Sequence, residues 1–184
     1  MSAQVFLAAL TYFRILSVPV VMALILAGPE RDAAYNVAAV LFAFSASTDF
    51  LDGFLARRWE KTTTLGSFLD TTADKLLVSG ALIALVEVDR ASAWIAALIV
   101  ARELLILGLR GVVAADGTVF KPSIWGKLKA NVQFVAILLA IVRFDLELGP
   151  LLLDEWAMLV AAGITVMSAV EYLARFGSAL TAEQ

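Results

Sequence analysis

Apolar residues are gathered in six long runs that short polar connectors separate. A helix that crosses a membrane needs roughly 20 mainly apolar residues, and each run has about that length. The six runs are Val5–Ala27, Ala33–Phe50, Phe68–Val88, Ser92–Ala114, Trp125–Val142 and Leu152–Phe176. Good helix formers follow the second run, so we expect it to continue as one helix through Arg58. The pattern predicts an all-α, polytopic membrane protein with six transmembrane helices.

The connectors between the runs contain residues that are typical of turns. These are Gly28-Pro29, the Thr62–Thr64 run with Gly66, Asp116-Gly117, Lys121-Pro122 and Gly149-Pro150. No change in composition marks off a soluble domain or a low-complexity tail. Residues 1–184 are therefore expected to form a single integral-membrane domain.

Composition supports a membrane protein and excludes several chemistries. Hydrophobic residues make up 61% of the 184 residues and charged residues 17%, with a mean hydropathy of +0.89. A soluble domain has about 45–50% apolar and about 25% charged residues, and a chain of this length cannot hide the excess in a core. The absence of histidine and cysteine excludes zinc sites with these ligands, Ser-His and Cys-His nucleophile pairs, and disulfides. A bound metal would therefore be a hard, oxygen-liganded ion.

The distribution of positive charge predicts the orientation in the membrane. Six spans place both termini on one side, and most Lys and Arg residues fall on that side: Arg57, Arg58, Lys61, Lys121, Lys127, Lys129 and Arg175. The other connectors contain only Arg31, Arg90 and Arg143 among several acidic residues. The positive-inside rule then places both termini in the cytoplasm. The net charge of −3 argues against a nucleic-acid partner.

Four aspartates lie where the second and third runs meet the cytoplasmic side. Asp49 and Asp52 are three residues apart and Asp70 and Asp74 are four apart, so each pair shares one helix face. Four carboxylates at one depth repel one another, and two divalent cations, Mg²⁺ or Mn²⁺, are the natural neutralising partners. The alternative is that the carboxylates are solvated at helix ends or paired with Arg57, Arg58 and Lys75.

The linear pattern around these aspartates is more specific. It reads Asp49-x-x-Asp52-Gly53-x-x-Ala56-Arg57, then eight residues, then Gly66-x-x-x-Asp70-x-x-x-Asp74. This pattern resembles the signature of the CDP-alcohol phosphotransferases, which are integral-membrane enzymes of phospholipid synthesis, and it matches at every fixed position. The resemblance extends to the six-helix organisation. It implies the fold of that family for the whole chain, as one catalytic domain, and a homodimer as its assembly.

The small and basic residues of this pattern have physical roles of their own. Gly53 and Ala56 lie one turn apart and leave a groove where a nucleotide could approach the helix backbone, although small residues also serve helix packing. Arg57 can offer a bidentate fork to a diphosphate, or can anchor the helix at the cytoplasmic interface. Gly66 is expected to precede the third helix. The resemblance assigns CDP-diacylglycerol binding to Asp52, Gly53, Ala56, Arg57 and Gly66.

Further cations lie in the fourth and fifth runs. Arg102 lies near the middle of the fourth run and needs a buried partner, and we expect Glu103 to face elsewhere on the helix. Arg110 and Lys127 could form a basic pocket beside the carboxylates, suited to a substrate with its own phosphate. Lys129 is expected to contact lipid head groups or to matter less than Lys127. The sequence leaves open whether Arg14 extends to the interface or lines the same cavity.

Several segments resemble phosphatidylglycerophosphate synthases in particular. These segments are Leu10-Thr11-x-x-Arg14, Ala101-Arg102-Glu103, Leu109-Arg110, Trp125-Gly126-Lys127-x-Lys129 and Glu171-Tyr172. Two departures are visible: Gln4–Ala9 replaces the usual Asn-x-Pro-Asn segment, and Thr71 stands where proline commonly follows the third aspartate. The first departure bears on any head-group contact made by the N-terminal segment.

The resemblance implies transfer of a phosphatidyl group from CDP-diacylglycerol to glycerol 3-phosphate, with release of CMP. Asp49, Asp52, Asp70 and Asp74 are then the expected metal ligands, and Asp74 is also the candidate general base. Arg102, Arg110 and Lys127 are expected to bind the acceptor phosphate. Alternatives within the family are an inositol-phosphate acceptor, as in phosphatidylinositol phosphate synthase, and phosphatidylglycerol, as in cardiolipin synthase. An alternative of another class is a divalent-cation transporter, but a pathway needs polar groups continuing toward the other membrane face.

Overall fold

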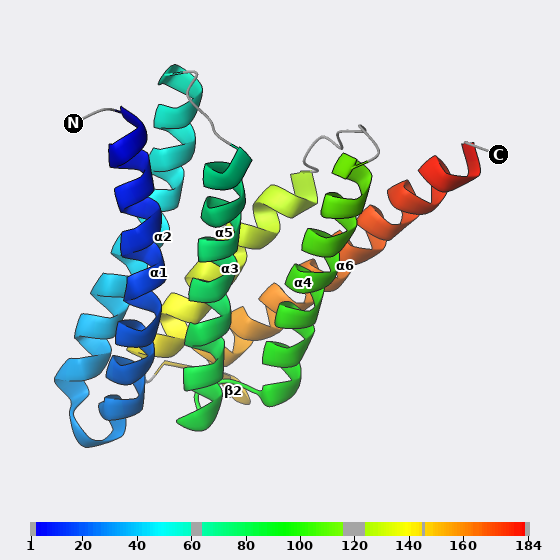
Figure 1. The fold of residues 1–184 in the computed structure, drawn as a ribbon. Helices are drawn as coiled ribbons and strands as arrows, with labels where there is room; N and C mark the ends of the chain where they lie inside the picture. The colour runs from blue at the N-terminus through cyan, green and yellow to red at the C-terminus, as the bar shows by residue number, and fades with distance from the viewer. Residues whose placement is uncertain (1–2, 60–63, 116–123, 145, 183–184) are drawn as a thin grey trace.

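The computed structural model describes residues 3–59, 64–115, 124–144 and 146–182. At 3–7, 49–59, 64–65, 67, 115, 124, 127 and 177–182 the description covers the backbone alone. The described residues form six α-helices, one short 3₁₀ helix (η1) and two short strands (Figure 1). The helices are α1 (Ala3–Ala27), α2 (Asp32–Trp59), α3 (Thr64–Glu87), α4 (Ala93–Ala115), α5 (Ile124–Val142) and α6 (Leu153–Ala182).

The six predicted helices are confirmed within the described residues, with two differences in extent. Helix α3 begins at Thr64, so Gly66 lies in its first turn and does not precede it. Helix α6 continues past Phe176 to Ala182. Both extensions are more polar than the apolar runs, and helical hydrogen bonding continues through them because no proline interrupts it.

Turn residues produce the connections that the sequence indicated. Gly28 and Pro29 lie in η1 (Gly28–Glu30) between α1 and α2. Gly149, with φ of +74°, turns the chain between β1 (Glu147–Leu148) and β2 (Leu151–Leu152), which pair antiparallel. This hairpin was not predicted, because strands of two residues are too short to show an alternating pattern. The Asp116-Gly117 and Lys121-Pro122 connectors lie outside the described residues.

Helix α1 packs along both α2 and α3, more extensively than α2 and α3 pack against each other. Helix α5 packs against α6 and α2, and α4 packs against α6 and α3. The core is made of small and branched residues such as Val21, Ala38, Leu82 and Ile137. Small residues allow this close approach: a Cβ atom at Gly80 of α3 would lie 2.7 Å from Cγ1 of Val18 on α1.

Both chain termini lie at the same end of the bundle (Figure 1). The C-terminal ends of α2 and α4 and the N-terminal ends of α3 and α5 lie at that end too, which we call the terminal end. The opposite end has η1, the turn from α3 to α4 and the hairpin. This arrangement is the one expected when an even number of helices run alternately up and down the bundle.

Two helical segments of the described chain are both long and apolar enough to cross a membrane by length and composition: Ala8–Glu30 and Leu153–Phe176. The other helices do not meet this criterion: α4, for instance, contains Arg102, Glu103 and Arg110, and the apolar part of α5, Leu128–Val142, is shorter. Six membrane crossings are therefore not established by hydropathy of the described helices. The charged residues that lower the hydropathy of these helices include the candidate metal-binding and phosphate-binding residues.

Candidate functional site

The directions of the helices bring the candidate residues into one half of the molecule. Asp70 and Asp74 lie in the first turns of α3, and Lys127 and Lys129 lie in the first turns of α5. Arg102 lies near the middle of α4 and Arg110 in its last two turns, and Asp49 and Asp52 lie in the last three turns of α2. Each of these segments is near the terminal end (Figure 1). The candidate site thus draws on α2, α3, α4 and α5 at one depth.

Asp70 is bound by an arginine from α1. Nη1 of Arg14 lies 2.8 Å from Oδ1 of Asp70, and the Asp70 side chain remains 32% exposed. The Arg14 side chain is completely buried. The structure therefore decides what the sequence left open: Arg14 lies in the interior beside a predicted metal ligand and does not reach the lipid interface.

The same guanidinium also binds α2. Nε of Arg14 donates to the carbonyl oxygen of Ser45 at 3.3 Å, and Nη2 donates to Oγ1 of Thr48 at 3.2 Å. Thr48 directly precedes Asp49 in the chain. One guanidinium therefore spans the distance between Asp70 on α3 and the part of α2 where the first aspartate pair begins.

Asp74 is paired with its neighbour in the sequence. Nζ of Lys75 donates to Oδ2 of Asp74 at 2.9 Å. Oδ1 of Asp74 is buried and has no hydrogen-bond partner within the described part of the chain. The alternative that a lysine neutralises the aspartates thus holds for one oxygen of Asp74, and the other oxygen remains available for a ligand.

Glu103 is the centre of a buried ion cluster, which we define as Lys75, Arg102, Glu103 and Lys129. The Glu103 side chain is 2% exposed, and its Oε2 lies 3.1 Å from Nζ of Lys75. Its Oε1 accepts a hydrogen bond from Nζ of Lys129 and lies 3.4 Å from Nη1 of Arg102. Helices α3, α4 and α5 meet at this one carboxylate.

Two expectations about this cluster were wrong. Glu103 does not face away from Arg102, because the long arginine side chain reaches around the helix to the adjacent carboxylate. Lys129 is not at the surface but 4% exposed. Lys129 thus faces the interior, and the side chain of Lys127 lies outside the described residues.

The predicted acceptor-binding cations are arranged along α4 and α5. Nη2 of Arg102 donates to Oγ of Ser168 on α6 at 2.7 Å, in addition to the ion pair of Nη1 with Glu103. Arg110 is exposed, and both arginines interact electrostatically with the hydroxyl group of Tyr172 on α6. These two cations therefore border the same part of α6. Lys127 lies on α5, but its side chain falls outside the described residues.

Part of the predicted donor and metal site is described at the backbone alone. Asp49, Asp52, Gly53, Ala56 and Arg57 all lie on α2, with the one-turn separation expected between Gly53 and Ala56. Their side chains are outside the described part. Gly66, Asp70 and Asp74 are successive positions four apart on α3 and share one face.

The described oxygen donors are compatible with a hard cation. No group of three acidic side chains that could hold a metal occurs among the side chains that are described, from which Asp49 and Asp52 are missing. Asp70 and Asp74 nevertheless lie one turn apart, and the buried Oδ1 of Asp74 lacks a hydrogen bond there. Buried charged oxygens are costly unless they are paired, so either a cation or the hydroxyl group of a substrate would satisfy this oxygen.

Three residues of this site were not assigned a catalytic or substrate-binding role from the sequence: Lys75, Glu103 and Lys129. Lys75 was named only as an alternative partner of the aspartates, and Lys129 was expected to contact lipid head groups. A signal for them was present. Lys129 and Gln133 are four residues apart on α5, and Thr165 and Ser168 are three apart on α6, which marks a polar face on each apolar helix. Gln133 donates to Thr165 across this interface at 2.9 Å.

Comparison with known proteins agrees with the pattern around the aspartates. The profile of the CDP-alcohol phosphatidyltransferase family matches residues 7–167. This range extends into all six helices and includes every residue that the sequence predicted for the site.

Individual relatives are similar over nearly the full chain. A CDP-diacylglycerol–glycerol-3-phosphate 3-phosphatidyltransferase from Bacillus subtilis is 37% identical over 182 residues, which cover 93% of this chain and 94% of the relative. A protein of the same name from Pseudomonas fluorescens is 34% identical and covers 89% of this chain and 86% of its own length. A probable phosphatidylglycerophosphate synthase from Mycobacterium tuberculosis is 40% identical, over 90% of this chain and 78% of its own.

Proposed function

Because this chain belongs to the CDP-alcohol phosphatidyltransferase family, we propose that it transfers a phosphatidyl group from CDP-diacylglycerol to glycerol 3-phosphate. The products are phosphatidylglycerophosphate and CMP. The observation that carries this proposal is the near full-length similarity to the Bacillus subtilis relative, whose name specifies both substrates. The relatives from Pseudomonas and Mycobacterium bear names of the same activity.

In the proposed reaction the hydroxyl oxygen of the acceptor forms a bond to the phosphorus that carries the lipid, and the bond from that phosphorus to CMP breaks. Asp74 takes the hydroxyl proton as general base. Its buried Oδ1, which accepts no hydrogen bond in the described part of the chain, is the oxygen that supports this role.

Separate groups of residues hold the two substrates in this proposal. Asp52, Gly53, Ala56, Arg57 and Gly66 bind the nucleotide and diphosphate of the donor. Arg102, Arg110 and Lys127 bind the acceptor phosphate, and the position of both arginines beside Tyr172 supports a shared anion site. Charge-assisted hydrogen bonds of this kind are the strong ones in phosphate recognition.

Asp49, Asp52, Asp70 and Asp74 would hold two Mg²⁺ or Mn²⁺ ions. When bound, the ions supply neutralisation of the donor diphosphate and of the charge that develops on the leaving CMP. Asp70 is shared with Arg14, which holds one of its oxygens in place.

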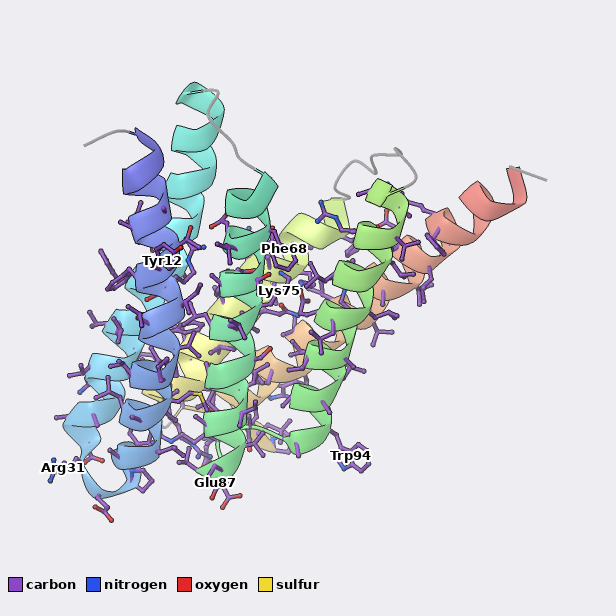
Figure 2. All side chains as sticks on the ribbon, viewed as in Figure 1. Tyr12, Arg31, Phe68, Lys75, Glu87 and Trp94 are labelled. Carbon is purple, nitrogen blue, oxygen red and sulfur yellow. The ribbon has the colours of Figure 1, made fainter. Side chains whose placement is uncertain are left out.

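We propose that all six helices cross the cell membrane, with both termini and the active site on the cytoplasmic side. Large apolar side chains are exposed on every helix, for example Leu16, Val40, Ile83, Leu104, Val135 and Val170. A soluble monomer rarely exposes apolar patches larger than a few hundred Å². Trp94, 87% exposed, points outward at the end opposite to the termini, as expected of a side chain in a membrane interface (Figure 2). The family resemblance also implies a homodimer within the lipid, for which the mass of the purified protein in nanodiscs is the test.

The test is release of CMP by the purified protein from CDP-diacylglycerol, with one acceptor supplied at a time. Glycerol 3-phosphate, inositol 3-phosphate and phosphatidylglycerol are compared at equal concentration, and the lipid products are identified by mass spectrometry. We expect rapid release with glycerol 3-phosphate alone. Faster release with either other acceptor would overturn the proposed acceptor, and no release with any of them would overturn the proposed activity.

A further inference from the structure

Lys75 is held between two carboxylates that come from different helices. Its Nζ lies 2.9 Å from Oδ2 of Asp74 on α3 and 3.1 Å from Oε2 of Glu103 on α4. Figure 2 shows Lys75 in the interior, on the side of α3 that faces α4. Its side chain is 22% exposed. An ammonium group shared by two carboxylates in a largely dry site has little freedom to move.

The contact between Lys75 and Asp74 depends on this second carboxylate. Adjacent residues on a helix do not face each other, so the sequence alone does not bring these two side chains together. Glu103 draws the ammonium group of Lys75 into the interior, where it binds Oδ2 of Asp74. The other oxygen of Asp74, Oδ1, is left without a hydrogen bond among the described residues.

Glu103 is itself fixed from its other side. Lys129 of α5 donates to Oε1, and Nη1 of Arg102 lies 3.4 Å from the same oxygen. With Oε1 held by these two cations, Oε2 points toward Lys75. Lys129 of α5 thus helps to fix the orientation of Glu103. Glu103 in turn fixes the position of the Lys75 ammonium group at Asp74.

We propose that Glu103 is a positioning residue that acts on Asp74 through Lys75. It holds the ammonium group on Oδ2, so that Oδ1 is the oxygen presented to the acceptor hydroxyl. This inference rests on the proposed function, in which Asp74 takes the proton of that hydroxyl. Without the negative charge of Glu103, the ammonium group of Lys75 can move to bind both oxygens of Asp74.

The first experiment compares Glu103→Gln with the wild-type chain in the CMP-release assay. Glutamine keeps the size of the side chain and removes its charge. We expect kcat to fall by about 10- to 100-fold, the usual effect of misplacing a reacting group by removing its support. The KM for CDP-diacylglycerol should stay unchanged, because Glu103 is not among the residues of α2 and α3 that are proposed to bind the donor. An unchanged kcat would overturn the proposal.

Gln133→Leu is the matched control for lost stability. Gln133 lies one turn from Lys129 on α5 and is about as buried as Glu103. Its hydrogen bond to Thr165 does not involve the ion cluster. We expect its thermal unfolding midpoint to fall while kcat stays at the wild-type value. If Gln133→Leu lowers kcat as much as Glu103→Gln does at an equal loss of unfolding temperature, Glu103 has a structural role alone and the proposal is overturned.

A double-mutant cycle with Lys75→Met then tests the route of the effect. If Glu103 acts through Lys75, the double variant should be no slower than the slower single variant, because the second change removes nothing further. If the double variant is still active and its loss in kcat equals the product of the two single losses, the positioning role is contradicted. The proposed function then still stands. A wild-type chain that releases no CMP with any acceptor would overturn the proposed function, and this inference with it.

Discussion

One carboxylate oxygen of Asp74 has a hydrogen-bond partner, and the other has none among the described residues. Lys75 binds Oδ2, and Oδ1 is buried without a hydrogen bond from any described residue. A general base needs one oxygen free to receive a proton while the rest of the carboxylate is held still. The Asp74 environment meets both conditions.

Asp74→Asn should abolish turnover and largely preserve binding of CDP-diacylglycerol. Loss of a general base costs about 10²- to 10⁴-fold in rate, and an amide cannot take the proton. Asp49→Asn should weaken metal binding as well, because an amide oxygen is a weaker ligand than a carboxylate for a hard cation. Turnover is followed by CMP release, and metal affinity by calorimetry with Mn²⁺. Equal loss of turnover with full metal affinity in both variants would contradict this division of roles.

Arg110→Ala and Lys127→Ala should raise the KM for glycerol 3-phosphate far more than the KM for CDP-diacylglycerol. A hydrogen bond between a charged group and a phosphate contributes about 1.5–3 kcal/mol, so each change should cost roughly 10- to 150-fold in acceptor affinity. Arg57→Ala should show the opposite bias and affect the donor. Steady-state kinetics with each substrate varied in turn distinguishes the two patterns.

Arg31→Ala is the control for these variants. Arg31 is exposed and lies at the end of the bundle away from the site (Figure 2). Its removal should leave both KM values unchanged. Equal weakening of donor and acceptor binding in the Arg57, Arg110 and Lys127 variants would mean that these cations serve folding or membrane anchoring. Lys129 is unsuitable as a control, because it is buried against Glu103.

Among the elements, α1 connects the two helices that carry the aspartates. It packs along both α2 and α3, and its single buried arginine binds Asp70, Ser45 and Thr48. Ser17, one turn further along α1, donates to the carbonyl oxygen of Arg14 and accepts from Ser45 on α2. The relative position of α2 and α3 at the site therefore depends on a helix that carries none of the signature aspartates.

Arg14→Met should destabilise the folded protein. Removing one partner of a buried ion pair costs about 3–5 kcal/mol in soluble proteins, and the partial exposure of Asp70 places the expected loss near the lower end, about 3 kcal/mol. Arg14→Lys should recover part of this, because it restores the charge without the fork that binds Ser45 and Thr48. Thermal unfolding in detergent measures both. A methionine variant as stable as the wild type would show that the contacts of Arg14 are not needed for the packing of α1.

At the scale of the whole molecule, the charged groups of the site are confined to the half of the bundle near the termini. The described part of that half has both unmatched acidic oxygens and an excess of cations around Glu103. The other half of the described core is mainly apolar, with residues such as Ile25, Tyr35 and Leu85, and Asp154 is a buried acidic residue there. A polar route through the bundle, which a cation transporter would need, is therefore not supported by the described residues.

Activity should require added Mg²⁺ or Mn²⁺ and should disappear on treatment with EDTA. The proposed site needs hard divalent cations between its aspartates and the donor diphosphate, and the chain has no histidine or cysteine to hold a softer metal. The measurement is CMP release in metal-free buffer with each divalent ion titrated back. Full activity in the presence of EDTA would contradict the proposed two-ion site.

The proposed topology can be tested by cysteine labelling, because the native chain has no cysteine to remove. Ser92→Cys, in the exposed turn between α3 and α4, should react with a membrane-impermeant maleimide added outside intact cells. Thr62→Cys, between α2 and α3, should react only after the membrane is opened. The reverse pattern would place the active site on the outer face, and reaction of both positions in intact cells would exclude the six-span arrangement.

Much of the architecture is local in origin and could be read from the chain. The six apolar runs predicted six helices, because the length and periodicity of such a run depend on neighbouring residues alone. The turn glycines at 28 and 149 likewise predicted where the chain reverses. The signature from Asp49 to Asp74 identified the family, because its fixed spacing places chemistry-bearing residues on single helix faces.

The partners of the buried charges were decided by tertiary structure. Periodicity shows that Lys127 and Lys129 point in different directions, but the rotation of α5 against α4 decides that Lys129 meets Glu103. In the same way, Arg14 could have reached the interface, and the packing of α1 between α2 and α3 buries it beside Asp70. A buried charge needs a partner, and that partner lies 26 residues away for Lys129 and 56 for Arg14. No local pattern specifies such a pairing, because it arises only when separate helices pack together.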